Sequence, residues 1–394
     1  MLIIVAPGQG AQTPGFLAPW LEIPEFSARI DWLSAVAGLD LAHYGTDADA
    51  ETIRDTAIAQ PLLVAAGLVS AITLFPHPAD AFRRIGAVAG HSVGELGAAA
   101  GARAITAEQA MVLVRERGKA MAAAAAATPT GMSALLGGDQ DEVLATIERH
   151  GLTAANVNGA GQIVAAGTLE QLEALAADPP PRARVRPLQV AGAFHTEHMA
   201  GAVDTLASLA RSVSTHDPRT PVISNRDGKI VHDGQQVVRR IVGQIASPVR
   251  WDLCMETMAD LGVTGILEVP PSGTLVGLAK RALPGVETFA LKTPDQLDEA
   301  RAFVERHGTP SPIDTSPTWR LLVAPGKGTF SSAGAREGDV LEPTATVGTI
   351  TSLRDQTPVV APHGGRIVEW LVEDGDPVAP GQPLIRLHPE GVSA

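Results

Sequence analysis

Ser92 lies in a pattern typical of a catalytic nucleophile. The sequence Gly-His-Ser-Val-Gly at residues 90–94 follows the short apolar run 85–89 and precedes an Ala-rich stretch that favours a helix. A serine on a sharp strand-to-helix turn needs neighbours without Cβ atoms, and the helix that follows directs backbone N–H groups at an acyl oxygen. The pattern therefore predicts a nucleophile elbow.

A serine nucleophile also needs a base and donors for the developing oxyanion. His195 stands in a Gly/Ala-rich turn after the strand-like segment 185–190 and is the candidate base, although a lone His is more often structural. His91 adjoins the nucleophile and is expected to support the turn. The Gly-rich turn 7–12 is either a simple tight turn or a second oxyanion element, with the backbone N–H of Gln9 beside that of Val93.

Arg117 lies in a segment whose apolar residues recur at the spacing of a helix. Turned inward, its planar guanidinium would need an anionic partner, and a substrate carboxylate would fit its two-pronged geometry. The alternative is a solvated helix face.

Length and composition predict a multi-domain protein in the cytoplasm. The 394 residues are 45% hydrophobic, and the net charge of -13 disfavours non-specific nucleic-acid binding. The single cysteine, Cys254, forbids an internal disulfide and is expected in the core. The apolar run 2–6 is too short for a signal peptide or a membrane span.

Strand-like and helix-like segments alternate along the first three quarters of the chain, which predicts an α/β core with a mostly parallel sheet. The expected strands are 2–6, 132–136, 163–166, 221–224, 265–268 and 287–290, and the expected helices are 60–74, 106–127, 140–150, 169–176, 198–212 and 272–281. The block from about 130 to 190 is expected to form an inserted subdomain.

The Pro/Ser/Thr-rich segment 308–318 reads as a linker between a first domain, 1–307, and a second, 319–390. The second contains a repeat, since Val-Ala-Pro at 323–325 and Glu-Gly-Asp at 337–339 are matched by Val-Ala-Pro at 360–362 and Asp-Gly-Asp at 374–376, a separation of 37 residues. Two equivalent half-units of short strands predict a small barrel or sandwich with pseudo-twofold symmetry.

Together these motifs resemble the malonyl-CoA:acyl-carrier-protein transacylases, in their bacterial, actinobacterial-like form. The resemblance covers residues 1–307 and rests on seven ordered motifs, at 7–12, 60–61, 90–95, 117–118, 156–162, 192–195 and 247–251. It implies an α/β-hydrolase-like core with parallel sheet and an inserted ferredoxin-like subdomain.

The resemblance assigns the catalytic roles. It implies that Ser92 is the nucleophile, that His195 is the base, and that the backbone N–H groups of Gln9 and Val93 form the oxyanion hole. The family pattern places a backbone carbonyl that orients the His at Ser247. No Asp stands in a convincing triad position, which fits a Ser–His dyad.

Substrate contacts follow from the same resemblance. Arg117 would hold the malonyl carboxylate, and Gln60 and Asn158 would help to bind the substrate. The bulk of Phe194 would disfavour a branch at the acyl α-carbon, as in methylmalonyl. No metal is implied.

The mechanism implied is ping-pong. Ser92 takes malonyl from malonyl-CoA and passes it to the phosphopantetheine thiol of acyl carrier protein, in fatty-acid or polyketide synthesis. No nucleic-acid or membrane partner is expected. Basic residues that could dock an acidic carrier are Lys280, Arg281, Arg182, Arg184 and Arg186.

The tail resembles biotinyl/lipoyl carrier domains, an all-β barrel-sandwich. Those domains carry a modifiable lysine at the hairpin between their halves, where this chain has Arg354. A guanidinium stays protonated and is a poor nucleophile. Lys327, the tail's only lysine, lies elsewhere in the repeat, so no biotin or lipoate cofactor is expected.

Two other functions compete with malonyl transfer. A hydrolase that edits wrongly primed carriers could use the same Ser–His pair, although a carboxylate clamp at Arg117 would be wasted on simple acyl chains. A non-catalytic assembly scaffold is the third, against which the intact motifs argue. The carrier, the tail's role and the oligomeric state are left open by the sequence.

Overall fold

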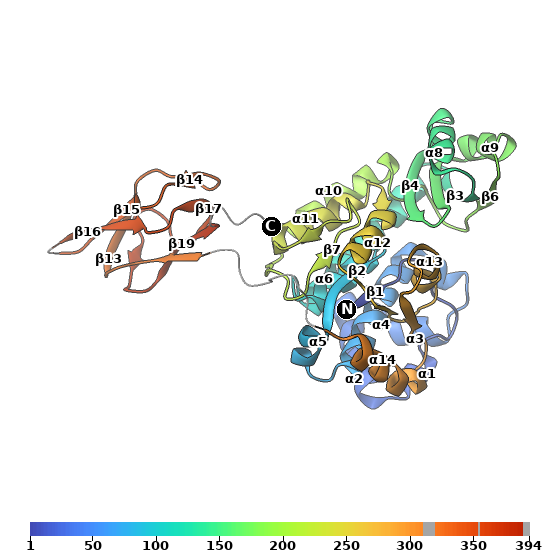
Figure 1. Ribbon diagram of the computed structural model, residues 1–394, viewed down its shortest axis with the longest axis horizontal. Helices are drawn as coiled ribbons and strands as arrows, with labels where there is room; N and C mark the ends of the chain where they lie inside the picture. Colours follow the sequence, from blue (N-terminus) through green and yellow to red (C-terminus); the bar gives the residue numbers. More distant parts are fainter. Residues whose placement is uncertain (310–319, 354, 389–394) are drawn as a thin grey trace. The chain divides into compact units, whose positions relative to one another are not determined.

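The computed structural model describes residues 1–309, 320–353 and 355–388 and divides the chain into two compact units, Met1–Asp314 and Thr315–Ala394 (Figure 1).

A six-stranded sheet forms the centre of the first unit. Its strands run in the order β11-β10-β1-β2-β7-β8 and are parallel except for β8, which pairs antiparallel with β7. Their bounds are β1 Leu2–Ala6, β2 Ile85–Gly90, β7 Val222–Ile223, β8 Ile230–Val231, β10 Gly265–Glu268 and β11 Glu287–Ala290. The parallel sheet predicted from the sequence is confirmed.

Both faces of this sheet are covered. Along β1, Leu2 and Ile4 join one apolar cluster with the neighbouring helices, while Ile3 and Val5 join another. Successive side chains of a strand point to opposite faces, so a strand buried on both faces reads as a continuous apolar run.

Helices make up most of the remainder of this unit. Among the described residues one helix, α4, is long and apolar enough to cross a membrane. In the fold, however, 72% of its 18-residue apolar stretch is buried. The helices are α1 Ala18–Leu21, α2 Pro24–Ala37, α3 Leu41–Thr46, α4 Thr56–Leu74, α5 Pro78–Arg84, α6 Gly94–Gly101, α7 Ala107–Ala127, α8 Gln140–Arg149, α9 Leu169–Ala177, α10 Ala200–Ala210, α11 Gly234–Gln244, α12 Trp251–Asp260, α13 Thr274–Ala282 and α14 Leu297–His307.

A second sheet with its own apolar core occupies the block expected as an insertion. Its strands run in the order β6-β3-β5-β4-β9, with bounds β3 Thr130–Gly137, β4 Thr153–Gly159, β5 Gln162–Thr168, β6 Ala183–Pro187 and β9 Val249–Arg250. Residues of α8 and α9 complete the core. The short strand β9 comes from outside the block and pairs parallel with β4.

The second unit contains only strands among its described residues. They form two four-stranded sheets, β12-β19-β17-β14 and β16-β15-β13-β18. The bounds are β12 Arg320–Val323, β13 Gly328–Ser332, β14 Val340–Leu341, β15 Ala345–Thr351, β16 Gln356–Ala361, β17 Gly365–Trp370, β18 Pro377–Val378 and β19 Pro383–His388.

The two halves of this unit exchange backbone hydrogen bonds in a symmetric way. The N–H of Phe330 donates to the carbonyl of Asp376 over 2.9 Å, and the N–H of Ile367 donates to the carbonyl of Asp339 over 2.8 Å. These residues are equivalent under the sequence repeat, so the predicted pseudo-twofold relation is present in the fold.

Candidate active site

Ser92 lies at the turn between β2 and α6. Its φ is 52°, in the left-handed region that a non-glycine residue seldom adopts. A Cβ on Gly90 would lie 1.9 Å from the carbonyl carbon of Gly94, and a Cβ on Gly94 would lie 2.3 Å from the carbonyl oxygen of Ala6. Both glycines are therefore required by close backbone approach, and the strained turn exposes the serine as the elbow pattern predicts.

His195 and Ser92 are within hydrogen-bond distance of each other, as the expected Ser–His dyad requires. The Ser92 Oγ lies 2.7 Å from the His195 Nε2, and the Nδ1 lies 2.7 Å from the backbone carbonyl oxygen of Gln244. Because a carbonyl can only accept, Nδ1 carries the proton and Nε2 is left to accept the serine proton.

The expectation that Ser247 orients His195 is wrong. The carbonyl that does so belongs to Gln244, the last residue of α11. The final carbonyls of a helix lack partners four residues on, so this one is available to the imidazole. The backbone N–H of Ser247 itself donates to the same carbonyl, over 3.2 Å.

The environment of His195 keeps it neutral. The ring is buried, and burial, reinforced by the positive charge of Arg117, lowers the pKa of His195 to about 3. Both causes disfavour the imidazolium. The side chain is thus a base in its unprotonated form before substrate arrives.

Arg117 is turned inward, toward the nucleophile. Its Nη1 donates to the Gln60 Oε1 at 2.7 Å, and its Nη2 donates to the Gln244 Oε1 at 3.0 Å and lies 3.4 Å from the Ser92 Oγ. The Nε has no hydrogen-bond partner among the described residues. Burial lowers the pKa of Arg117 to about 10, so the group remains a cation at neutral pH.

The two expected oxyanion elements lie side by side. Val93 directly precedes α6, and a Cβ on Gly8 would lie 2.9 Å from the His91 Nδ1, so the 7–10 turn abuts the elbow. The Gln9 side chain is directed elsewhere, with its Nε2 donating to the carbonyl of Arg54 over 3.1 Å. Any contribution of Gln9 to an oxyanion hole thus comes from its backbone.

Asn158 and Phe194, which were expected to contact the substrate, contact other parts of the protein in the structure. The Oδ1 of Asn158 lies 2.9 Å from the Nε2 of His91, so this amide supports the histidine beside the elbow. Phe194 is 7% exposed and belongs to the larger core cluster.

Glu95, Asn225 and Gln244 form a buried network beneath Ser92 and His195. No role for these three residues was expected from the sequence. The Asn225 Oδ1 accepts from the Ser92 N–H (2.8 Å) and the Gln244 Nε2 (3.0 Å), and the Asn225 N–H donates to the Glu95 Oε1 (2.6 Å). The Gln244 Nε2 also donates to Glu95. Asn225 follows β7 as Ser92 follows β2, so both residues lie at the carboxyl edge of the same parallel sheet. A polar residue just after a predicted strand is the sequence signal that could have identified Asn225.

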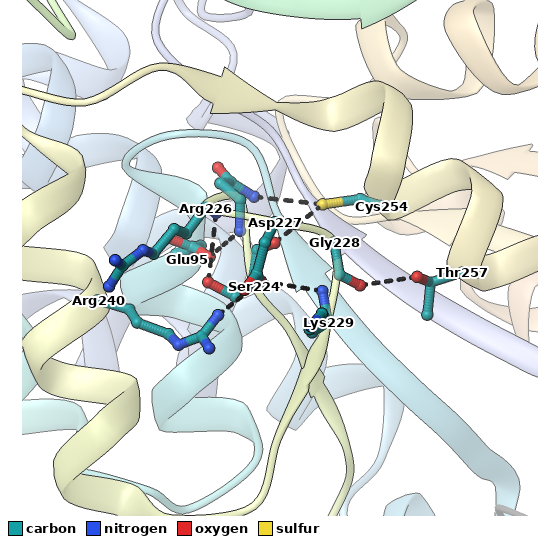
Figure 2. A network of polar contacts seen from close by, with 10 residues as sticks. Glu95, Ser224, Arg226, Asp227, Gly228, Lys229, Arg240, Cys254 and Thr257 are labelled. Carbon is teal, nitrogen blue, oxygen red and sulfur yellow. Dashed lines mark hydrogen bonds and ion pairs between the residues drawn. The ribbon is translucent and has the colours of Figure 1, made fainter.

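Figure 2 shows the surroundings of Glu95. Burial raises the pKa of Glu95 to about 7, against the lowering effect of the Asn225 N–H and of the nearby arginines. Cys254 donates to the carbonyl of Ser224 over 3.4 Å, and burial raises the pKa of its thiol. Cys254 is therefore a core residue, as predicted.

This arrangement supports acyl transfer through an acyl-serine. A neutral imidazole can take the Ser92 proton, and the buried guanidinium beside Ser92 is positioned to hold an acyl group that carries a second, anionic end.

Comparisons with known proteins agree with this site. Residues 3–298 match the acyl transferase domain family. The malonyl CoA-acyl carrier protein transacylase of Mycobacterium bovis is 52% identical over 304 residues, which are 76% of this chain and 99% of the relative. The crystal structure of MCAT from Mycobacterium tuberculosis superposes with a TM-score of 0.74 at 51% identity, covering 76% of this chain and 99% of that one.

A third similar protein was solved with its partner, as a type II PKS acyl-carrier protein in complex with its malonyl-transacylase. It has a TM-score of 0.69 at 29% identity and covers 76% of this chain and 99% of that one. The family match spans most of the chain, and the first relative is matched along nearly its whole length. The chain therefore belongs to the malonyl CoA-acyl carrier protein transacylases.

Proposed function

We propose that this protein transfers the malonyl group from malonyl-CoA to the phosphopantetheine thiol of an acyl carrier protein, through a malonyl ester on Ser92. The observation that carries the proposal is the buried Arg117, whose Nη2 lies 3.4 Å from the Ser92 Oγ. Within the described residues no carboxylate forms a direct ion pair with this cation, although the charge of Glu95 acts on it from beyond contact distance. A malonyl carboxylate would supply the missing anion and fix the distance between the clamp and the thioester carbon.

In the first half-reaction, His195 accepts the proton of Ser92 as the Oγ bonds to the thioester carbon. The C–S bond then breaks, and the proton passes from His195 to the leaving CoA thiolate. The proposed oxyanion donors are the backbone N–H groups of Val93 and Gln9. The carbonyl of Gln244 stabilises the imidazolium that forms in between, because it accepts from Nδ1.

In the second half-reaction the carrier thiol gives its proton to His195 and attacks the malonyl ester, and Ser92 recovers its proton. We assign carrier docking to exposed basic residues. Arg184 and Arg186 lie on the edge strand β6, with Arg182 just before it, and Lys280 and Arg281 end α13.

The specificity roles of Gln60, Phe194 and Asn158 belong to the same proposal. Gln60 is supported by its bond to Arg117. Asn158 would act indirectly, by holding His91. The bulk of Phe194, next to the base, would limit branching at the acyl α-carbon.

For the second unit the proposal is a biotinyl/lipoyl-like fold without an attached cofactor. Two four-stranded sheets related by a repeat support the fold. The hairpin between β15 and β16 holds the position where such domains carry lysine. Arg354, the residue there, lies outside the described residues. We also propose that the two domains span residues 1–307 and 319–390. The proposed location of the protein is the cytoplasm.

The test is intact-protein mass after mixing with malonyl-CoA, in the parent and in Ser92→Ala. We expect a malonyl-sized gain in the parent and none in the variant, followed by loss of the gain when holo carrier protein is added. CoA release without a stable mass gain would favour an editing hydrolase, and neither release nor gain would favour a scaffold. The mass of the untreated protein reports any cofactor on the second unit.

A further inference from the structure

An apolar cavity of about 320 Å³ lies behind the nucleophile elbow, between α4, α5, α6 and the strands β1 and β2. Its walls include Leu63, Leu68, Phe75, Phe82, Val88 and Val269. None of Ser92, His195 and Arg117 lines it, so it is distinct from the space that the malonyl group occupies in the proposed reaction.

Only two of the residues that line this cavity carry polar side chains, Thr220 and Arg103. Thr220 is buried, whereas Arg103 is exposed just beyond the end of α6. Ile72 on α4 is also partly exposed, at 40%. The cavity therefore combines an apolar interior with one cationic group at its solvent side.

Two glycines on α6 that line the cavity have no packing reason to be glycine. A Cβ on Gly97 would meet only the Cβ of Ala6, at an ordinary 3.8 Å, and a Cβ on Gly101 would meet nothing within 4 Å. Glycine is less favourable than alanine in a helix interior, so a helical glycine calls for a reason. Gly97 is partly buried, so a side chain there would enter the cavity, whereas Gly101 is exposed at the last position of α6.

By contrast, the two other helical glycines that line the cavity are confined by neighbours. A Cβ on Gly94 would lie 2.3 Å from the Ala6 carbonyl oxygen, and a Cβ on Gly67 would lie 3.2 Å from the Val269 Cγ2. Helix packing explains those positions, and it does not explain Gly97 and Gly101.

We propose that this cavity binds a linear alkyl chain with an anionic head, of the chemical class of medium-chain fatty carboxylates. Its volume is at the small end of ligand sites, which span about 300–1,000 Å³. An apolar cavity favours an apolar guest, because the guest's methylene groups are removed from water when they are buried there. A carboxylate at the solvent side would meet the guanidinium of Arg103, which suits it geometrically.

The experiment measures binding of decanoate to the full-length protein by calorimetry and by the rise in Tm. The parent is compared with Gly97→Leu and with Ala71→Leu, which fill the cavity from α6 and from α4. Gly277→Leu is the matched control, because Gly277 is also a partly buried helical glycine, a Cβ there meets nothing within 4 Å, and it is remote from the cavity lining. Acylation of Ser92 by malonyl-CoA, which needs no carrier protein, verifies that each variant is folded.

We expect saturable binding to the parent and to Gly277→Leu, and loss of binding in both filling variants. Decanol should bind more weakly than decanoate, and Arg103→Gln should raise the Kd for decanoate about tenfold while leaving decanol unchanged. Absence of saturable binding to the parent, or undiminished binding in both folded filling variants, would overturn the site. Equal affinity for decanol and decanoate would overturn the anionic head.

Discussion

At the scale of single residues, the buried charge of Arg117 dominates the site. A cation removed from water is costly unless it is paired, and its partners here are the neutral side-chain oxygens of Gln60 and Gln244. The empty protein thus holds a guanidinium whose best partner is missing. In the proposed reaction a substrate carboxylate would supply the direct ion pair that Glu95, which acts on Arg117 without contact, does not provide, so binding energy would be concentrated on substrates with a second acid group.

Replacement of Arg117 by Ala should therefore change substrate preference. We expect kcat/KM for malonyl-CoA to fall by about 10²-fold or more, the loss associated with truncating one side of a buried charge pair. Use of acetyl-CoA, which has no carboxylate to clamp, should fall much less. Parallel assays of CoA release with the two thioesters measure the ratio, and equal losses would refute the clamp.

The lowered pKa of His195 predicts an unusual acid limb in the pH profile. Between pH 8 and about pH 5 the imidazole stays neutral, so the kcat/KM of the acylation step should not fall near pH 6.5, where a free histidine titrates. Rapid-quench measurement of malonyl-Ser92 across this range tests it. Because burial raises the pKa of Glu95 itself to about 7, the measurement is repeated in Glu95→Gln, and an inflection near 6.5 that persists there would show that the ring is hydrated in the working enzyme.

The same shift has a cost for the fold. The unfolded chain binds a proton at His195 near pH 6.5, whereas the native protein does not until about pH 3. Because the unfolded state then binds more protons, this group's contribution to stability is lost as the pH falls through that interval.

The sequence predicted the residues that do chemistry better than those that hold them. Ser92 is marked by the Gly-x-Ser-x-Gly pattern, and His195 and Arg117 are marked by their places in the series of ordered motifs. Gln244 acts through a backbone carbonyl and an amide side chain, and neither leaves a pattern in the sequence. The orienting carbonyl was therefore expected three residues too late, at Ser247.

At the scale of elements, the elbow depends on how closely β2 and α6 approach. Gly90→Ala should disrupt it, because the new Cβ would lie 1.9 Å from a backbone carbon and no rotamer can relieve that contact. We expect loss of Ser92 acylation together with a lower Tm. Gly277→Ala is the control, since a helical alanine without clashes stabilises by about 0.4–1 kcal/mol. An active, stable Gly90→Ala protein would contradict the elbow geometry.

The elements themselves were predictable to different degrees. Strand β1 matches the expected bounds because both of its faces are covered and its apolar run is uninterrupted. Strands β10 and β11 match because their positions in the alternation of strands and helices identify them. Strand β9 has only two residues, Val249 and Arg250, and its pairing with β4 is a tertiary choice that a short segment cannot signal.

At the scale of the whole molecule, the family match ends before the second unit begins. Residues 3–298 carry the acyl transferase match. A protein truncated after residue 309 should therefore retain malonyl transfer within about twofold of the full chain. Purified carrier protein and malonyl-CoA suffice for the assay, and loss of transfer in a folded truncated protein would assign the second unit a catalytic role.

The hydrogen bonds between the two halves of the second unit make each half depend on the other. Phe330 and Ile367 each donate to a carbonyl in the opposite half, in addition to the hydrogen bonds that close the turns 336–339 and 373–376 within their own halves. A polypeptide with only one half would complete these bonds solely by meeting another copy of itself. The unit thus has the arrangement of a homodimer whose two halves are joined in one chain.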